Sequence, residues 1–325
     1  MPLDPYLTAR IGAVADIGRH NFDEPDSQTR LAEFRRDPEP WSQPPLDIVD
    51  RTVPGPHGEV DIRVYSPRAS PVGTLVWMHG GAFSGGDLDM NESHVVSSEL
   101  ASRTSFRVIA VGYRLATGGV RHPVPLDDVV AAWAWADRDR RSNGGALAIG
   151  GASAGAALAL GAAIRVRDAR LTAPDALLLA YPAVHFPVPA LDDSTAAEMK
   201  RLPEFTRAPA AAIRDMYANY VGRIYDLPVL AVPGHATLAN LPPVSIIGSE
   251  LDEMRPSADL LLAQLADSGV PVDYHLARGM LHGHLDRTPS LPTVDESLRY
   301  FATALASAAD RVGRSRSDPR IVADD

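Results

Sequence analysis

Short apolar runs alternate with helical patterns along most of this chain, and no other feature of the sequence restricts its fold as strongly. The runs have the length and composition of strands that are buried on both faces. They read "GTLVWMHGG" (73–81), "FRVIAVGYRL" (106–115), "ALAIGG" (146–151), "ALLLAYP" (176–182), "VSIIGSELD" (244–252) and "VDYHLARGM" (272–280). Helical patterns separate several of them, at 125–140, 153–168 and 257–269. Buried strands joined through helices form parallel sheets, so we predict an α/β fold with a mostly parallel central sheet flanked by helices.

The ends of this pattern are less regular. Apolar residues at helical spacing predict a helix over 3–19, and residues 37–57 are rich in proline and acidic residues, which indicates a connector. The stretch "VDIRVYSP" (60–67) alternates apolar and polar residues, as an antiparallel strand does. A closing helix is predicted over 293–310.

Two segments break the alternation and both flank the predicted sheet. They contain amphipathic helical patterns and proline-rich stretches, so we expect them to fold together as a small helical cap. The predicted units are 1–50 (first part of the cap and connector), 51–185 (first part of the α/β core), 186–235 (second part of the cap), 236–310 (second part of the core) and 311–325 (flexible polar tail).

The composition excludes several classes of site and partner. The 325 residues include no cysteine, which rules out disulfides, thiolate metal ligands and a cysteine nucleophile. The formal net charge of −10 argues against nucleic acid as a partner, because binding phosphates needs a basic surface. No apolar run reaches the roughly 18 residues of a membrane span, and the N-terminus lacks the pattern of a secretory signal. We therefore expect a cytoplasmic protein with no membrane partner.

The stretch "LAIGGASAGAALAL" (147–160) places one serine among small residues where a strand passes into a helix. A tight turn with an incidental serine would give the same letters. At the carboxyl end of a buried strand, however, the pattern from Gly151 to Gly155 is typical of a nucleophile elbow, in which small neighbours let the backbone turn sharply and expose the serine Oγ. We therefore predict that Ser153 is a catalytic nucleophile, with a helix N-terminus behind it that favours negative charge.

A serine nucleophile needs a base, and the chain order on this kind of fold is serine, acid, histidine. His282 lies in "RGMLHGHLD" (278–286), just after a predicted strand and next to Gly283. His284 is the nearest alternative, and His275 falls inside the strand pattern, where a structural role is expected. We predict His282 as the base.

The base in turn needs an acid that orients it. Asp252 directly follows the buried strand "VSIIGSEL", and Glu250 and Glu253 are the alternatives beside it. The interval between Asp252 and His282 holds one helix and one strand, which brings both side chains to neighbouring strand ends at the same edge of the sheet. We predict Asp252 as the orienting acid.

The glycine-rich stretch "WMHGGAFSGGD" (77–87) follows another buried strand. Its turn would leave backbone N–H groups unpaired at the sheet edge, and two of these with the N–H of Ala154 would form an oxyanion hole for acyl transfer. A phosphate-cradling loop is the alternative, weakened because no Gly-Lys-Ser/Thr follows. The stretch 282–286 also fits the metal-ligand pattern H-x-H-x-D, but no partner cluster accompanies it.

Taken in order, these motifs resemble the hormone-sensitive-lipase-type esterases of the α/β-hydrolase superfamily over about residues 60–305. They are His79-Gly80-Gly81-Ala82-Phe83, Tyr113-Arg114-Leu115-Ala116, "PVPLDD", the turn around Ser153, Tyr181-Pro182, Asp252 with Arg255 after it, and His282-Gly283. The resemblance implies an α/β-hydrolase fold with a helical cap, and hydrolysis of short- to medium-chain carboxylic esters, a small-molecule substrate, without a cofactor. It also implies Gly81 and Ala82 as oxyanion donors, with His79 and Gly80 shaping the turn, and it allows a homodimer.

Three positions depart from the family's pattern. Ala82 replaces the third glycine of the loop, Ala152 replaces an aspartate of the elbow, and Ala156 replaces its last glycine. An alanine keeps its N–H, so the oxyanion hole survives if φ at Ala82 is negative. The departures bear on substrate preference more than on catalysis, because Ser153 itself is unchanged.

Two other functions remain open at this point. An amidase or an N- or O-deacetylase would use the same three residues, and matched ester and anilide substrates would separate it from an esterase. A catalytically inactive binding protein would lack one of the three, and all are present. Five apolar residues are candidates for pocket walls, with core packing as the alternative role; they are Phe22, Phe83, Phe186, Met216 and Tyr217.

Overall fold

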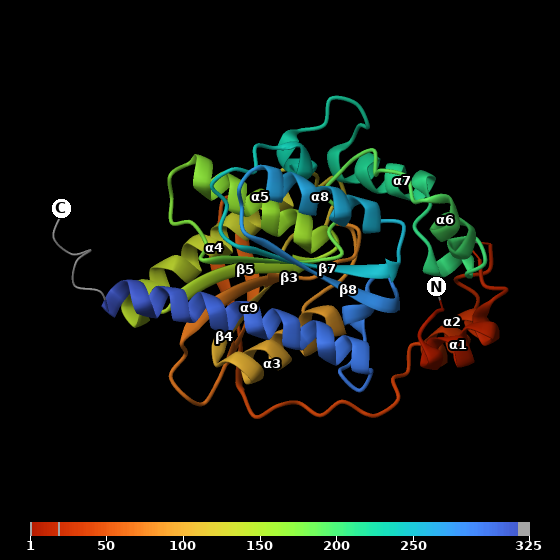
Figure 1. Cartoon of the computed structure of the whole chain (residues 1–325), viewed down its shortest axis with the longest axis horizontal. Coiled ribbons are helices and arrows are strands. Elements are labelled where there is room, and N and C mark those ends of the chain that lie inside the picture. The colour runs from red at the N-terminus through yellow and green to blue at the C-terminus, as the bar shows by residue number, and fades with distance from the viewer. Residues whose placement is uncertain (1, 19, 318–325) are drawn as a thin grey trace.

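The computed structural model of the chain describes residues 2–18 and 20–317, and within them it forms an eight-stranded sheet (Figure 1). The strand order is β1-β2-β4-β3-β5-β6-β7-β8. The strands are β1 Asp47–Gly55, β2 Gly58–Ser66, β3 Gly73–Met78, β4 Phe106–Gly112, β5 Ala146–Ala152, β6 Ala176–Ala180, β7 Val244–Leu251 and β8 Val272–Leu281. Strand β2 is antiparallel to β1 and to β4, and the other neighbouring pairs are parallel. The predicted α/β class and the antiparallel strand at 60–67 are confirmed.

Helices cover both faces of the sheet (Figure 1). Helices α4 (Val124–Asn143), α5 (Ala154–Asp168) and α8 (Arg255–Asp267) lie on one face, and α3 (Asn91–Thr104) and α9 (Pro292–Ser317) lie on the other. Each face has its own buried apolar cluster. Alternate residues of β3 contribute to opposite clusters: Val76 and Met78 belong to one, and Leu75 and Trp77 belong to the other. Both faces of the central strands are therefore buried, which is why they read as continuous apolar runs.

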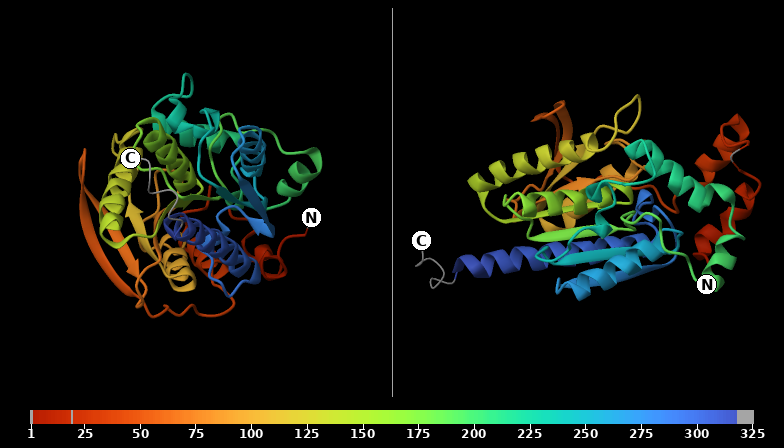
Figure 2. Two further views of the ribbon diagram at one scale, coloured as in Figure 1. Left: turned by 60° about the vertical axis from the view of Figure 1, so that its left-hand side comes forward. Right: turned by 90° about the horizontal axis from the view of Figure 1, so that it is seen from above.

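The two irregular segments meet at one end of the molecule (Figure 2), while residues 229–235 of the second one pack against α5. The first carries α1 (Pro5–Ile11) and α2 (Pro25–Phe34), and the second, over 186–235, carries α6 (Asp193–Met199) and α7 (Ala210–Val221). The rings of Phe34 and Phe205 meet edge to face at 5.7 Å and join the two segments. We call these segments, residues 2–18 with 20–46 and residues 186–235, the cover. The boundaries of a separate cap stay a prediction.

The structure differs from the prediction at both ends of the chain. The predicted connector contains strand β1, which was not predicted because its sequence is acidic and contains proline. Pro54 is accommodated there because β1 is an edge strand. The helix expected over 3–19 is only α1 followed by a 3₁₀ turn at Gly12–Val14. The tail does not begin at residue 311, because α9 continues to Ser317, and residues 318–325 lie outside the described part of the chain.

No helix within residues 2–18 and 20–317 is both long enough and apolar enough to cross a bilayer.

Candidate active site

The structure brings Ser153, Asp252 and His282 together at the carboxyl ends of β5, β7 and β8. Ser153 Oγ lies 2.8 Å from His282 Nε2, and His282 Nδ1 lies 2.7 Å from Asp252 Oδ2. Parallel strands end at the same edge of a sheet, so residues far apart in sequence meet there. The three residues form one continuous hydrogen-bonded chain.

The turn at Ser153 is sharp and strained. Its φ is +53° and its ψ −115°, a conformation that few non-glycine residues adopt. A Cβ at Gly151 would lie 2.4 Å from the carbonyl oxygen of Gly155, and one at Gly155 would lie 2.3 Å from that of Met78. Only glycines fit at both places, because the end of β3 passes directly against the turn.

The environment of His282 favours its protonated form. Burial acts against a charge on the imidazole, but the nearby charge of Asp252 and its hydrogen bond outweigh burial and raise the pKa of His282 above its ordinary value. Asp252 is fully buried, and its second oxygen accepts the N–H of Met254 at 2.7 Å. The aspartate therefore fixes which nitrogen of His282 carries the proton and leaves Nε2 facing Ser153.

The alternative histidines have other partners. His284 is buried between the hydroxyls of Ser249 at 2.9 Å and Ser297 at 3.0 Å, and burial lowers its pKa to about 3. The ring of His275 stacks on Tyr300, with centroids 5.3 Å apart. Both side chains therefore contact the body of the protein and not Ser153.

The alternative acids also have other partners. Glu250 accepts the N–H of Gly279 at 2.8 Å, and Glu253 accepts the N–H of Ala208 at 3.1 Å. As for the metal-ligand pattern at 282–286, no group of three or more His, Cys, Asp or Glu residues is placed to hold a metal ion in residues 2–18 and 20–317.

The glycine-rich loop after β3 adopts left-handed backbone at successive residues. The carbonyl of Gly81 accepts the N–H groups of Ser84 and Gly85, at 3.0 and 2.8 Å, and closes a tight turn. That turn gives Gly81 a φ of +105° and Ala82 a φ of +54°. The condition of a negative φ at Ala82 is therefore not met: the turn that a third glycine would make without strain is made here by an alanine, at a cost of about 1 kcal/mol. In the described chain, the N–H groups of both residues donate no hydrogen bond.

His79 and Tyr113 support the loop from inside the protein. Their rings stack with centroids 4.6 Å apart, and the Tyr113 hydroxyl donates to the carbonyls of His79 and Gly80 at 2.9 and 3.1 Å. Nδ1 of His79 lies 2.7 Å from the Gly80 carbonyl, and burial lowers the pKa of His79. A neutral imidazole therefore shapes the turn, the role that the family resemblance implied for it.

Glu92 contacts the same loop, and the sequence reasoning missed it. Its Oε2 accepts the N–H of Gly80 at 2.6 Å, and its Oε1 accepts the hydroxyl of Tyr181, whose ring lies edge to face with His282 at 5.0 Å. Only 3% of Glu92 is exposed, and burial raises its pKa to about 7. The signal was present in "NESHVVSSELA", because Glu92 stands four residues before Val96 and therefore on the apolar face of α3.

A cavity of about 400 Å³ opens onto Ser153. Gly81, Ala82 and His282 line it together with Ser153, and its other walls are mainly apolar. Those walls include Met90, Ile213, Met216 and Met254. Of the five apolar residues proposed as pocket walls, Met216 lies on this lining, whereas Phe83 and Tyr217 are fully buried in the core. We call this space the serine cavity.

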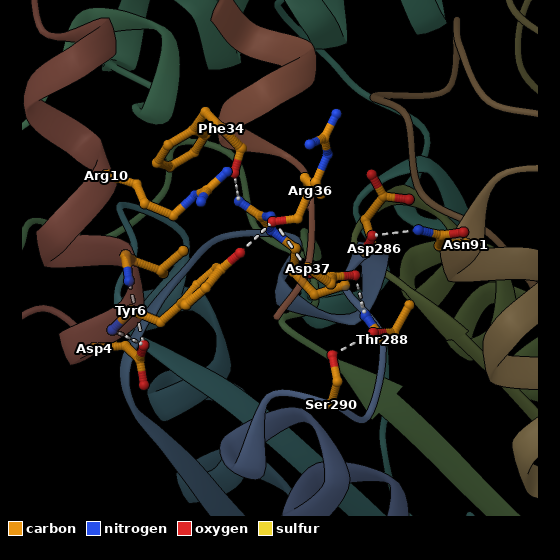
Figure 3. Close-up of polar contacts among 12 residues, drawn as sticks. Asp4, Tyr6, Arg10, Phe34, Arg36, Asp37, Asn91, Asp286, Thr288 and Ser290 are labelled. Atoms are coloured by element: carbon orange, nitrogen blue, oxygen red, sulfur yellow. Dashed lines mark hydrogen bonds and ion pairs between the residues drawn. The ribbon is translucent and has the colours of Figure 1, made fainter. Parts of the chain in front are cut away.

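The loop after His282 is tied to the cover and to α3 (Figure 3). Asp37 accepts the N–H of Thr288 at 2.9 Å and pairs with Arg287 at 3.4 Å, while the Phe34 carbonyl accepts from Arg287 at 3.0 Å. On the other side, Asn91 donates to the carbonyl of Asp286 at 3.0 Å. The loop that carries the candidate base is thus fixed from two directions.

Known proteins resemble this chain in sequence and in fold. A profile of the alpha/beta hydrolase fold family matches residues 75–286. Esterase LipI of Mycobacterium tuberculosis is 30% identical over 292 residues, 85% of this chain and 86% of that protein. An esterase of Pyrobaculum calidifontis superposes with a TM-score of 0.75 at 27% identity, covering 95% of this chain and 99% of that one. A bacterial heroin esterase superposes with a TM-score of 0.75 at 25% identity, covering 94% and 98%. The chain is therefore a member of the α/β-hydrolase superfamily, of the hormone-sensitive-lipase type of carboxylesterases.

Proposed function

We propose that this protein hydrolyses short- to medium-chain carboxylic esters of small molecules through an acyl-enzyme on Ser153. One observation carries the proposal: Asp252, His282 and Ser153 form a hydrogen-bonded chain, and its serine end faces a cavity with mainly apolar walls. A nucleophile, a base and an orienting acid in that order are the requirements of acyl transfer. The volume of about 400 Å³ falls in the range of small-molecule pockets.

In the first half of the reaction, Ser153 Oγ attacks the ester carbonyl and His282 Nε2 takes the serine proton. Asp252 stabilises the imidazolium that forms, an assignment supported by the raised pKa of His282. The negative charge on the carbonyl oxygen is stabilised by the N–H groups of Gly81, Ala82 and Ala154. The first two line the serine cavity, and Ala154 is the first residue of α5, whose N-terminus favours negative charge.

In the second half, His282 gives its proton to the departing alcohol oxygen, and the acyl group remains on Ser153. Water then attacks the acyl-enzyme, with His282 again as base. The carbonyl re-forms, the bond to Ser153 breaks, and the carboxylic acid leaves. Every proton moves through His282, so the cycle needs no cofactor.

The test is hydrolysis of p-nitrophenyl esters from C2 to C12 by the wild type and by Ser153→Ala. We expect activity to be greatest between C2 and C8 and to be lost in the variant, whose thermal unfolding should be as cooperative as that of the wild type. A folded wild type without activity, or a Ser153→Ala variant that keeps it, would contradict the proposal. Matched anilides measured in parallel separate ester from amide cleavage.

A further inference from the structure

A second cavity, of about 250 Å³, lies against the serine cavity. The two share the lining residues Arg207, Ala208, His282, Gly283 and Asp286. Phe34 and Phe205 line the second cavity on the cover side, together with Arg35, Arg207 and Arg287. We call it the arginine cavity.

Two of these arginines have no acidic side chain within ion-pair distance in the described residues. Neither Arg35 nor Arg207 forms an ion pair with any residue in 2–18 and 20–317, whereas Arg287 pairs with Asp37 at 3.4 Å. The Nε–H of Arg207 is buried and donates no hydrogen bond within that part of the chain. A buried guanidinium nitrogen without an acceptor is unfavourable, and a bound anion would provide one.

Asp286 is the acidic side chain on the shared lining. Its Oδ1 accepts the N–H of Glu92 at 3.4 Å. Burial raises the pKa of Asp286, while the charges of Arg35 and Arg287 act against that shift. Asp286 thus faces Arg35 and Arg287, while Glu253, outside both linings, acts on Arg207 and offsets part of its charge. On the linings themselves, three guanidinium groups stand against Asp286 and Glu92, which leaves a small excess of positive charge. Such an excess favours a singly charged ligand over a doubly charged one.

The position of His282 assigns the two cavities to the two parts of an ester. The acyl carbon must lie at Ser153 and beside the oxyanion donors, in the serine cavity. The alcohol oxygen must receive its proton from His282, which both cavities share. The alcohol part therefore extends past His282 toward Arg207.

We propose that the substrate is an ester of an apolar acid with an alcohol or phenol that carries a carboxylate, which Arg207 binds with support from Arg35. This inference rests on the function proposed above and adds the class of substrate to it. Arg207 is a specificity-determining residue in this view, since its guanidinium meets the substrate away from the reacting bond. A charge-assisted hydrogen bond of this kind corresponds to about a 10- to 100-fold gain in kcat/KM.

The experiment compares 4-acetoxybenzoate with its neutral methyl ester, methyl 4-acetoxybenzoate, which carries the same acetyl group. The measured quantity is the ratio of kcat/KM for the anionic to the neutral acetate ester. We expect Arg207→Gln to lower this ratio by about 10-fold or more, mainly through KM for the anion, and Arg207→Lys to lower it less. Added salt should reduce the wild-type ratio, because screening weakens the contact.

Arg201→Gln is the matched control. Arg201 lies six residues earlier in the same segment, with its side chain 75% exposed and paired with Glu198, so the ratio should not change. Arg35→Gln is a second variant, at an exposed position, and should also lower the ratio. It therefore tests the proposal even if the Arg207→Gln variant does not fold.

A ratio that stays constant in both the Arg207→Gln and Arg35→Gln variants would overturn the assignment. Hydrolysis of the neutral ester that survives Ser153→Ala would instead refute the proposed function. The two failures are therefore distinguishable within one set of assays.

Discussion

The carboxyl edge of the sheet and the cover above it hold the same site in different ways. At the edge, Ser153, Asp252 and His282 extend directly from strand ends, and close backbone contacts fix the turn around Ser153. The cover contributes short helices, several ring contacts and a few ion pairs, and it carries Arg35 and Arg207. We propose that the edge determines which reaction occurs and that the cover determines what reaches it.

If this division is correct, changes at the edge should remove catalysis without unfolding the protein. Asp252→Asn keeps the shape of the side chain and an acceptor for the N–H of Met254, but it removes the charge that stabilises His282. We expect kcat to fall by about 10³- to 10⁴-fold, with the melting temperature little changed. Steady-state kinetics and a thermal melt on the same preparation measure both. A loss of less than tenfold would show that Asp252 is not the orienting acid.

Glu92 allows a test of the support beneath the edge. Its folded-state pKa of about 7 lies above the ordinary value of 4.5, so the folded protein binds this proton more tightly than the unfolded chain. Its contribution to stability is therefore complete below pH 4.5 and is lost as the pH rises through 7. The loss is on the order of 3 kcal/mol.

The measurement is denaturant unfolding of the wild type and Glu92→Gln from pH 4 to 8. Glutamine keeps an acceptor for the N–H of Gly80 but does not ionise. The free-energy difference between the two proteins should shift in favour of Glu92→Gln across this interval. A difference that does not vary with pH would contradict the raised pKa of Glu92.

The cover should respond in the opposite manner to the edge. Asp37→Asn keeps an acceptor for the N–H of Thr288 but removes the ion pair with Arg287. We expect a loss of about 1–3 kcal/mol in unfolding free energy, because the largely buried guanidinium of Arg287 loses the negative charge with which it pairs. KM should change more than kcat. A fall in kcat comparable with that of Asp252→Asn would break the division between edge and cover.

The smallest expected effect is at the loop itself. Ala82→Gly relieves the left-handed backbone of Ala82 but adds freedom to the unfolded chain, so we expect a gain below about 1 kcal/mol. The control is Ala306→Gly, at an exposed position of the long helix α9, where the same change should cost about 1 kcal/mol. Opposite signs at the two positions would confirm the strain at Ala82.

Sequence reasoning succeeded where local pattern and strand ends determine position. Ser153 and Asp252 follow strongly apolar runs and His282 follows a more polar strand pattern, so their meeting at one edge follows from parallel pairing of three recognisable strands. It failed for β1 because an edge strand can be acidic and contain Pro54. It failed for Glu92 because the place of this residue on the apolar face of α3 indicates burial but does not reveal its contacts with Gly80 and Tyr181. The positive φ of Ala82 could not be predicted either, because an alanine occupies the position where a glycine would have indicated such a turn.

Gly155 has no room for a side chain, because the backbone of Met78 and His79 lies directly against it. This contact limits where such an enzyme can change its substrate range. The serine turn and the end of β3 cannot shift independently, so we expect the distance between Ser153 and the loop after β3 to stay constant when the sequence changes elsewhere. Variants with altered substrate range should therefore arise through changes in the cover, where each intermediate sequence can remain an active catalyst. In a laboratory selection on new esters, we expect the accepted substitutions to accumulate there and to leave Gly151 and Gly155 untouched.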